Sequence, residues 1–299
     1  MYESDNPIDQ LVHLYVDGAF NRRELVKRVM QRTGSLAAAM GALAGYEEMK
    51  AAEPTAEEEK ARAAVRVPRD AFDIEANDME FTGPASTLYG HLAKPNEWDG
   101  KTGVLVVHEN RGLVEHIKDV TRRAARGGFL ALGVDLLSRQ GGVQNFTEPT
   151  QQTQAYGRTN QTDRRADLLA GFELLKSMGA TKIGMTGFCA GGGNTWDFAV
   201  NVPELAAAVP FYGAVPAIAD LPKINAPVLA MYAERDRGLT TNLFPVAAEM
   251  IRLQKAFGMN IYEGAGHAFH NDTGAAYNGQ AADDAWSRTM LWFDKFLRA

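Results

Sequence analysis

The sequence predicts an α/β protein in which helices cover both faces of a mostly parallel sheet. From about residue 71 to the C-terminus, short apolar runs rich in β-branched residues alternate with longer helical patterns. The run at 103–108 is apolar almost throughout, as expected of a strand that is buried on both faces. Strands that alternate with helices in this way favour right-handed crossovers and a parallel sheet.

The elements follow one another without internal repeats. Phe72–Phe81 and Thr87–Ala93 predict two antiparallel strands joined at Gly83-Pro84. The remaining strands are predicted at 103–108, 129–134, 183–186, 206–212, 228–233 and 259–262. Helices are predicted at 113–126, through Leu168 to Leu175, just after Cys189, between Pro245 and Phe257, and at 286–297, with a polar loop at 138–153.

Residues 1–66 are interpreted as a helical N-terminal extension, and residues 67–299 as the main domain. Apolar positions from Leu11 to Phe20 have helical spacing, and Thr55 with Glu58 fits a capping box. Arg22-Arg23 followed by the apolar run 36–44 is similar to a twin-arginine export signal. The run is short and Ala-rich, so a cytoplasmic protein is favoured, with a periplasmic location as the alternative.

Composition limits the function classes. Lys and Arg total 31 against 37 Asp and Glu, a formal net charge of -6, which disfavours a broad nucleic-acid surface. The absence of a long apolar run disfavours a membrane-spanning helix. A single cysteine rules out an intrachain disulfide and a cysteine-based zinc site. We therefore expect a small-molecule substrate, with no cofactor, metal, nucleic-acid or membrane partner.

The lone cysteine occupies the position of a nucleophile. In Gly187-Phe188-Cys189-Ala190-Gly191, the thiol lies between a strand and a helix with glycine two residues away on either side. A nucleophile on a sharp strand-to-helix turn needs neighbours without side chains. The helix N-terminus favours the thiolate, and the N–H of Ala190 points to where an oxyanion would form. The alternative is a buried structural cysteine.

A base and an acid follow in the chain order that such a turn requires. His267 comes directly after the last strand, on a glycine-rich loop, and is favoured as the base over His270, which could be a surface histidine or a pocket wall. Asp236 comes shortly after the strand 228–233 and is favoured as the acid over Glu234.

The loop after the first parallel strand supplies further candidates. The backbone N–H of Asn110 is expected to be the second oxyanion donor. Glu109 is predicted to lie near the thiol, where a carboxylate disfavours ionisation of the sulfur. It is then either a gate on the nucleophile or a structural group paired with Arg111. His108 is interpreted as a satisfied core histidine.

These residues together resemble the dienelactone hydrolase family, within the α/β-hydrolase fold. The landmarks run in family order over about three quarters of the chain: 106–112, 134–139, 187–192, Phe211-Tyr212-Gly213 and 264–269. The resemblance implies a triad of Cys189, Asp236 and His267 that cleaves small esters or lactones through a thioacyl enzyme. It also implies that Glu109 restrains the thiol until substrate binds, and that Tyr156 and Tyr212 line the pocket.

The sequence also departs from the muconate-pathway enzymes of that family. Two arginines hold the dienelactone carboxylate there, and Gln152 and Asn271 stand at the matching positions here. Arg111, Arg158 or Arg139 could bind an anion from another direction. The extension could cover the pocket, mediate formation of a homodimer, or be inert. The alternative function is a ligand-binding or thiol redox-sensing protein on the same fold.

Overall fold

The computed structural model describes residues 22–35 and 66–299, and the chain divides into two compact units, Met1–Lys60 and Ala61–Ala299. In the first unit, the arginine pair lies at the start of helix α2 (Arg22–Thr33). The helical pattern at Leu11–Phe20, the apolar run 36–44 and the capping box at Thr55 lie outside the described residues.

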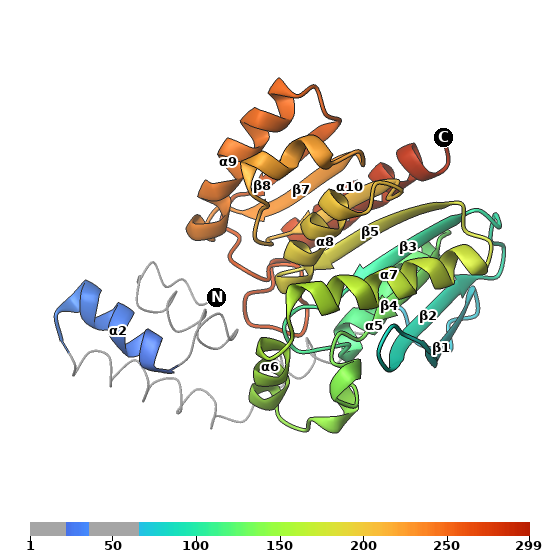
Figure 1. Ribbon diagram of the computed structural model, residues 1–299, viewed down its shortest axis with the longest axis horizontal. Helices are drawn as coiled ribbons and strands as arrows, with labels where there is room; N and C mark the ends of the chain where they lie inside the picture. Colours follow the sequence, from blue (N-terminus) through green and yellow to red (C-terminus); the bar gives the residue numbers. More distant parts are fainter. Residues whose placement is uncertain (1–21, 36–65) are drawn as a thin grey trace. The chain divides into compact units, whose positions relative to one another are not determined.

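The second unit contains an eight-stranded sheet in the order β1-β2-β4-β3-β5-β6-β7-β8 (Figure 1). Strand β2 runs antiparallel to β1 and β4, and every other neighbouring pair is parallel. The mostly parallel sheet that the sequence predicts is therefore confirmed. The strands are β1 (Ile74–Thr82), β2 (Thr87–Pro95), β3 (Thr102–Val107), β4 (Leu130–Val134), β5 (Lys182–Phe188), β6 (Ala207–Phe211), β7 (Val228–Ala233) and β8 (Phe257–Tyr262).

Two hydrophobic cores lie on opposite faces of this sheet. Along β3, Val104 and Val106 pack into one core and Leu105 and Val107 into the other, which is the period-two alternation of a strand. Helices α5 and α10 cover the first face, and α7, α8 and α9 cover the second (Figure 1). The helices are α5 (Glu115–Arg126), α6 (Pro149–Gly157), α7 (Gln161–Ser177), α8 (Ala190–Asn201), α9 (Arg237–Arg252) and α10 (Gly279–Leu297).

Three helices differ from the prediction. The loop predicted at 138–153 contains two short 3-10 turns and the start of α6, which has Pro149 at its first position. Helix α9 begins at Arg237 rather than near Pro245, because this proline lies inside the helix instead of opening it. Helix α10 begins seven residues earlier than predicted, at Gly279, since the Asn278 side chain accepts a hydrogen bond from Ala281 N–H and caps it.

The strand register determines which loops meet at the carboxyl edge of the sheet. Val107 of β3 lies opposite Gly187 of β5, so the loop after β3 and the turn after β5 leave the sheet at the same level. Ala233 of β7 lies opposite Tyr262 of β8, which brings the next two loops together. Reactive groups of parallel α/β sheets gather at this edge.

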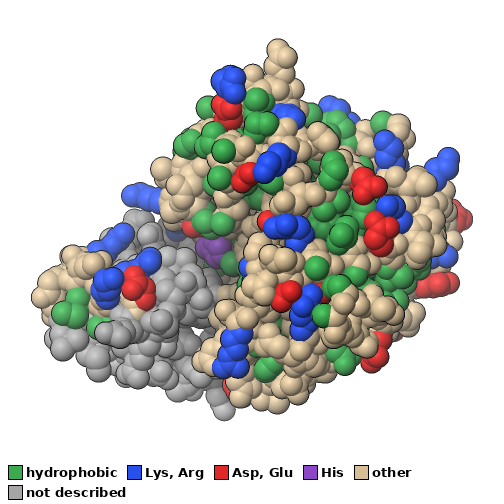
Figure 2. All heavy atoms as spheres, in the orientation of Figure 1, with side chains coloured by type: hydrophobic (Ala, Val, Ile, Leu, Met, Phe, Trp, Pro, Cys, Tyr) green, Lys and Arg blue, Asp and Glu red, His purple; other side chains and the backbone are tan. Residues whose placement is uncertain are grey.

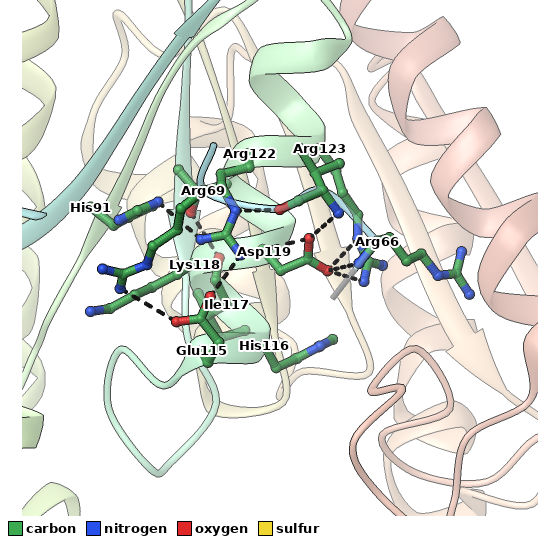
Figure 3. Close-up of polar contacts among 12 residues, drawn as sticks. Arg66, Arg69, His91, Glu115, His116, Ile117, Lys118, Asp119, Arg122 and Arg123 are labelled. Atoms are coloured by element: carbon green, nitrogen blue, oxygen red, sulfur yellow. Dashed lines mark hydrogen bonds and ion pairs between the residues drawn. The ribbon is translucent and has the colours of Figure 1, made fainter. Parts of the chain in front are cut away.

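A buried ionic cluster on α5 holds the segment that enters this unit (Figure 3). Asp119 accepts hydrogen bonds from the backbone N–H groups of Arg66 and Val67, at 3.3 and 2.8 Å. Arg123 donates to Asp119 and to Asp272, a residue of the loop before α10. Buried charges persist only when they are paired. The cluster therefore ties both the entering segment and the 272 loop to α5.

The visible surface of residues 66–299 carries lysine, arginine, aspartate and glutamate side chains interspersed, with no extensive patch of one sign (Figure 2). Among residues 22–35 and 66–299, no helix is long and apolar enough to cross a membrane.

Candidate active site

Cys189 lies on a strained turn between β5 and α8. Its φ of 53° and ψ of -114° place a non-glycine residue in a region that costs backbone energy. The surrounding structure holds it there, since Cys189 N–H donates to the Phe211 carbonyl at 3.1 Å. The thiol is free and half-buried. A strained turn between a strand and a helix is the kind of turn that can present a nucleophile at the edge of a sheet.

The glycines around the thiol are required by close backbone contacts. A β-carbon on Gly187 would meet the carbonyl group of Gly191, the second residue of α8. A β-carbon on Gly191 would meet the carbonyl oxygens of Val107 and His108 at the end of β3. Both contacts involve backbone atoms, which cannot move aside as a flexible side chain can. The glycine pattern thus lets the turn, the helix and the β3 loop approach one another.

His267 and Asp236 meet across the loops that follow β8 and β7. His267 Nδ1 donates to Asp236 Oδ2 at 2.6 Å, with both side chains largely buried. The two loops are joined by a hydrogen bond from Arg235 N–H to the Ala265 carbonyl, at 2.9 Å. Glu234, the competing acid, instead accepts from Gly264 N–H at 2.8 Å and so supports the histidine loop.

The environment of His267 favours its charged form. Burial by itself lowers the pKa of His267, but the charge of Cys189 and the hydrogen bonds to Asp236 and Cys189 outweigh it. The pKa of His267 therefore lies well above the ordinary histidine value. Because Nδ1 is bound to Asp236, Nε2 is the nitrogen left for the sulfur. An imidazolium beside the thiol stabilises a thiolate.

Two backbone N–H groups at this edge of the sheet, those of Ala190 and Asn110, are the predicted oxyanion donors. Ala190 is the first residue of α8, so its N–H has no acceptor within the helix. Among the described residues, neither Ala190 N–H nor Asn110 N–H donates to another backbone group. Donors that are fixed and unpaired beside a nucleophile are suited to hold an oxyanion.

Glu109 is held by Asn271 and not by the predicted partner Arg111. Asn271 Nδ2 donates to Glu109 Oε2 at 2.7 Å. Glu109 lies in the loop after β3 and Cys189 in the turn after the neighbouring strand β5, so both leave the sheet at the same edge. The alternative of a structural pair with Arg111 is therefore wrong, because the partner comes from the histidine loop, 162 residues away along the chain.

Each of the two predicted pocket tyrosines lies near one of the candidate catalytic residues. Tyr212 stands edge-on to His267, with ring centroids 5.2 Å apart. Tyr156 lies close enough for the charge of Cys189 to raise its pKa, after the larger effect of burial. Asn194 Nδ2 donates to the Tyr156 hydroxyl at 2.9 Å, and the Arg164 guanidinium lies 5.0 Å from the centre of its ring.

The sequence of this chain is similar to those of known proteins. The sequence profile of the dienelactone hydrolase family matches residues 88–297. This chain belongs to the dienelactone hydrolase family. It is 32% identical over 249 residues to a Methylorubrum extorquens protein named "Putative carboxymethylenebutenolidase", covering 78% of this chain and 86% of that protein. An Escherichia coli K12 protein of the same name is 31% identical, with 79% and 92% covered.

A solved structure agrees with the family assignment. The structure titled "Putative Dienelactone Hydrolase" from Klebsiella pneumoniae has a TM-score of 0.68 and 28% identity, covering 75% of this chain and 99% of that chain. The fold is thus the α/β-hydrolase fold that the sequence predicts, and the protein is a hydrolase of this family.

Three other residues considered in the sequence analysis of this dienelactone hydrolase family member have structural contacts. His108 is buried, accepts from Leu136 N–H through Nε2 at 2.9 Å and donates through Nδ1 to the Glu109 carbonyl, so it is a satisfied core histidine. His270 is not at the surface: it is buried and stacks on Phe188 with ring centroids 4.8 Å apart. Gln152 donates to the Phe146 carbonyl at 3.3 Å.

Several basic side chains lie near Tyr156, and one of them, Arg139, forms ion pairs with acidic side chains. A cavity of about 150 Å³ is lined by residues that include Arg139, Arg158 and Arg164. Arg139 is paired with Asp163 and Asp167, so it is not available as the anion site that the sequence suggested. Within residues 22–35 and 66–299, no group of three or more histidine, cysteine or acidic side chains could hold a metal ion.

Sequence reasoning missed the contacts that hold the site together. Asn271 appeared only as a departure from the family pattern, and Asn194 and Glu234 were not recognised as supports. Their partners lie 30 or more residues away along the chain. No local pattern of residues signals such pairs.

Proposed function

We propose that this hydrolase is a carboxylic-ester hydrolase that cleaves small esters or lactones through acylation of Cys189. The observation that carries the proposal is the arrangement of a free thiol on a strained turn, next to His267, whose Nδ1 is bound to Asp236 at 2.6 Å. Nucleophile, base and orienting acid in this relation are the signature of covalent acyl transfer.

In the first half-reaction, the Cys189 thiolate attacks the substrate carbonyl carbon and forms the C–S bond. The oxyanion accepts hydrogen bonds from the N–H groups of Ala190 and Asn110. Collapse of this intermediate breaks the C–O bond of the ester. The His267 imidazolium gives its proton to the leaving alkoxide, which leaves a thioacyl enzyme and a neutral imidazole.

In the second half-reaction, His267 takes a proton from water as the water oxygen attacks the thioester carbon. The same two N–H groups hold the oxyanion, the C–S bond breaks, and the acid product departs. The thiolate and the imidazolium are then restored. Asp236 keeps Nδ1 protonated throughout, so that Nε2 faces the reaction in both steps.

The names of the relatives support a lactone or ester as substrate. The matched curated proteins are named "Putative carboxymethylenebutenolidase", which is a lactone-opening activity. Glu109 leaves the sheet at the same edge as Cys189 and keeps its predicted role as a gate in this proposal, since a carboxylate near a thiol disfavours the thiolate. Tyr156 and Tyr212 form the walls next to the reacting groups.

A burst assay tests this proposal. The enzyme is mixed with p-nitrophenyl acetate and a panel of small lactones, and the wild type is compared with Cys189→Ala. We expect a burst of p-nitrophenol equal to the enzyme concentration, followed by turnover, in the wild type only. A wild type that releases no p-nitrophenol and opens no lactone, while its thiol still alkylates rapidly, would instead favour a thiol redox-sensing or ligand-binding protein.

A further inference from the structure

The side chain of Arg66 joins three points of the segment that follows His267. Its Nε lies 3.4 Å from Asp272 Oδ2, and its two terminal nitrogens donate hydrogen bonds to the Asp283 carboxylate and to the Tyr277 hydroxyl. These partners span residues 272–283, from the loop after β8 into α10. Because the guanidinium is planar and its donors point in fixed directions, one side chain holds both ends of this segment in a single arrangement.

The backbone of Arg66 is itself fixed on α5 (Figure 3). Asp119 accepts from the N–H groups of Arg66 and Val67, and Arg122 Nε donates to the Val67 carbonyl. Asp119 and Arg122 are buried, on a helix that packs against the sheet. Arg66 therefore connects a rigid helix to the segment 272–283.

The backbone between His267 and this segment is strained. Ala268 has a φ of 62°, a left-handed conformation that a residue with a side chain adopts only where its surroundings impose it. Asn271 N–H donates to the Ala268 carbonyl at 3.0 Å and closes the turn. The next residue, Asp272, accepts from Arg123 of α5. The turn 267–272 thus starts at the candidate base and ends at the carboxylate that Arg66 and Arg123 hold.

The position of this turn matters because the imidazole works between two partners. His267 donates through Nδ1 to Asp236 at 2.6 Å and is hydrogen-bonded to Cys189. The bond to Asp236 orients the ring, but the backbone of the turn determines how far the ring reaches toward the sulfur. Proton transfer requires heavy atoms within about 2.6–3.2 Å of each other, and a misplacement of about 1 Å can cost 10²-fold in rate.

We propose that Arg66 is a positioning residue for His267, which acts by holding Asp272, Tyr277 and Asp283 so that the strained turn keeps the imidazole at Cys189. The inference rests on the proposed function, in which His267 is the base, and adds a residue that positions it. Arg66 precedes residue 88, where the match to the family profile begins. The segment that enters the second unit thereby gains a part in catalysis.

The first test compares Arg66→Ala with Arg69→Ala. Arg69 lies on the same entering segment, but its ion-pair partners are Asp78 and Glu115, outside residues 272–283. We expect Arg66→Ala to lower kcat for p-nitrophenyl acetate about three- to tenfold with little change in KM, because Arg123 still holds Asp272 and Arg66 does not touch substrate. Arg69→Ala should stay within about twofold of the wild type.

The second test does not depend on ester hydrolysis. The rate of Cys189 alkylation by iodoacetamide is measured against pH, since an imidazolium at the sulfur favours the thiolate. A displaced His267 should move the midpoint of this profile to higher pH in Arg66→Ala and leave it in place in Arg69→Ala. Thermal unfolding of each variant shows that both assays are run on folded protein.

A milder variant keeps the proposal testable if Arg66→Ala does not fold. Tyr277→Phe removes only the hydroxyl that accepts from Arg66. It should produce a smaller part of both changes, in kcat and in the alkylation midpoint. In the double variant with Arg66→Ala it should add nothing further, because the shared contact is already absent.

The outcomes separate this inference from the proposed function. If Arg66→Ala loses thermal stability but keeps the wild-type kcat and alkylation midpoint, Arg66 is structural only and the inference is overturned, while Cys189-dependent turnover upholds the ester hydrolase. Equal losses in Arg66→Ala and Arg69→Ala would also overturn it. A midpoint that moves in Arg66→Ala alone, in a protein that hydrolyses no ester, would reject the hydrolase and retain the placement of His267 by Arg66.

Discussion

Two histidine–aspartate pairs in this protein have nearly the same geometry and opposite electrostatics. His267 Nδ1 lies 2.6 Å from Asp236 Oδ2, and His91 Nδ1 lies 2.7 Å from Asp78 Oδ1. Burial lowers the pKa of both histidines and the aspartate raises it in each case. The pKa of His267 nevertheless ends well above the ordinary value, and that of His91 below it.

The third neighbour makes the difference. His91 faces Arg122, which donates to its Nε2 at 3.3 Å, and the charges of Arg122 and Lys118 both lower its pKa (Figure 3). His267 faces Cys189, whose charge raises its pKa. The group beside the second ring nitrogen, and not the contact with the aspartate, thus distinguishes the raised pKa of His267 from the lowered pKa of His91.

The largest effect is expected from the nucleophile itself. Cys189→Ala should lower kcat for p-nitrophenyl acetate by about 10³-fold or more, since loss of a nucleophile leaves only binding and oxyanion stabilisation. Steady-state kinetics measure this, and far-ultraviolet circular dichroism confirms that the variant is folded. Residual activity within tenfold of the wild type would mean that another group carries the chemistry.

The two aspartates should differ greatly in their effect on activity. Asp236→Asn is expected to lower kcat/KM by about 10²–10³-fold, because the amide no longer holds Nδ1 protonated. Asp78→Asn, the matched change at the structural pair, should leave kcat/KM within about twofold. Glu234→Gln should likewise have a small effect. A larger loss in Glu234→Gln than in Asp236→Asn would reassign the acid.

The two histidines should give opposite pH dependence of stability. The folded-state pKa of His91 is lowered, so the unfolded chain binds the proton more readily and this contribution is lost as pH falls below about 6.5. The folded-state pKa of His267 is raised, so its contribution is present below about 6.5 and is lost as pH rises through the folded-state pKa.

Nuclear magnetic resonance titration of the histidine ring protons checks these directions. In Cys189→Ala the pKa of His267 should fall, because the thiolate charge is gone, and that of His91 should not change. In Asp78→Asn the pKa of His91 should fall further, because the aspartate raises it in the wild type. If the His267 pKa in Cys189→Ala equals that of the wild type, the sulfur is not the third neighbour.

The smallest effect is expected from a change at Glu109, the predicted gate on the Cys189 thiol. Glu109→Gln should increase the rate of Cys189 alkylation by iodoacetamide at neutral pH by about two- to fivefold, if the predicted gate places its negative charge near the sulfur. Glu173→Gln, at an exposed position on α7, serves as the control. Equal alkylation rates in Glu109→Gln and the wild type would contradict the predicted gate.

Local patterns in the sequence predict the strands and the residues at their carboxyl ends. Cys189, Asp236 and His267 each follow a strand of the sheet, so the parallel strands bring their loops to one edge, and the structure shows the histidine and the aspartate in contact. Their catalytic roles stay predictions. Helix α9 was misplaced because Pro245, a residue typical of helix starts, lies in its interior.

What the sequence does not predict are pairs formed by the tertiary fold. The contact between Glu109 and Asn271 joins loops after β3 and β8, and the sequence instead suggested the neighbouring Arg111 as a partner. Similarly, Arg139 is neutralised by Asp163 and Asp167 of α7, which removes it as an anion site. Side-chain pairing across loops depends on exact loop paths, for which residue spacing carries no signal.

The most direct test of the account is to trap the acyl enzyme. The wild type and Cys189→Ser are mixed with p-nitrophenyl acetate, quenched in acid during the burst, and analysed by intact-protein and peptide mass spectrometry. The account predicts a mass increase of one acetyl group on the peptide that contains Cys189, which disappears as substrate is exhausted. Release of p-nitrophenol by the wild type without acetylation of that peptide would contradict it.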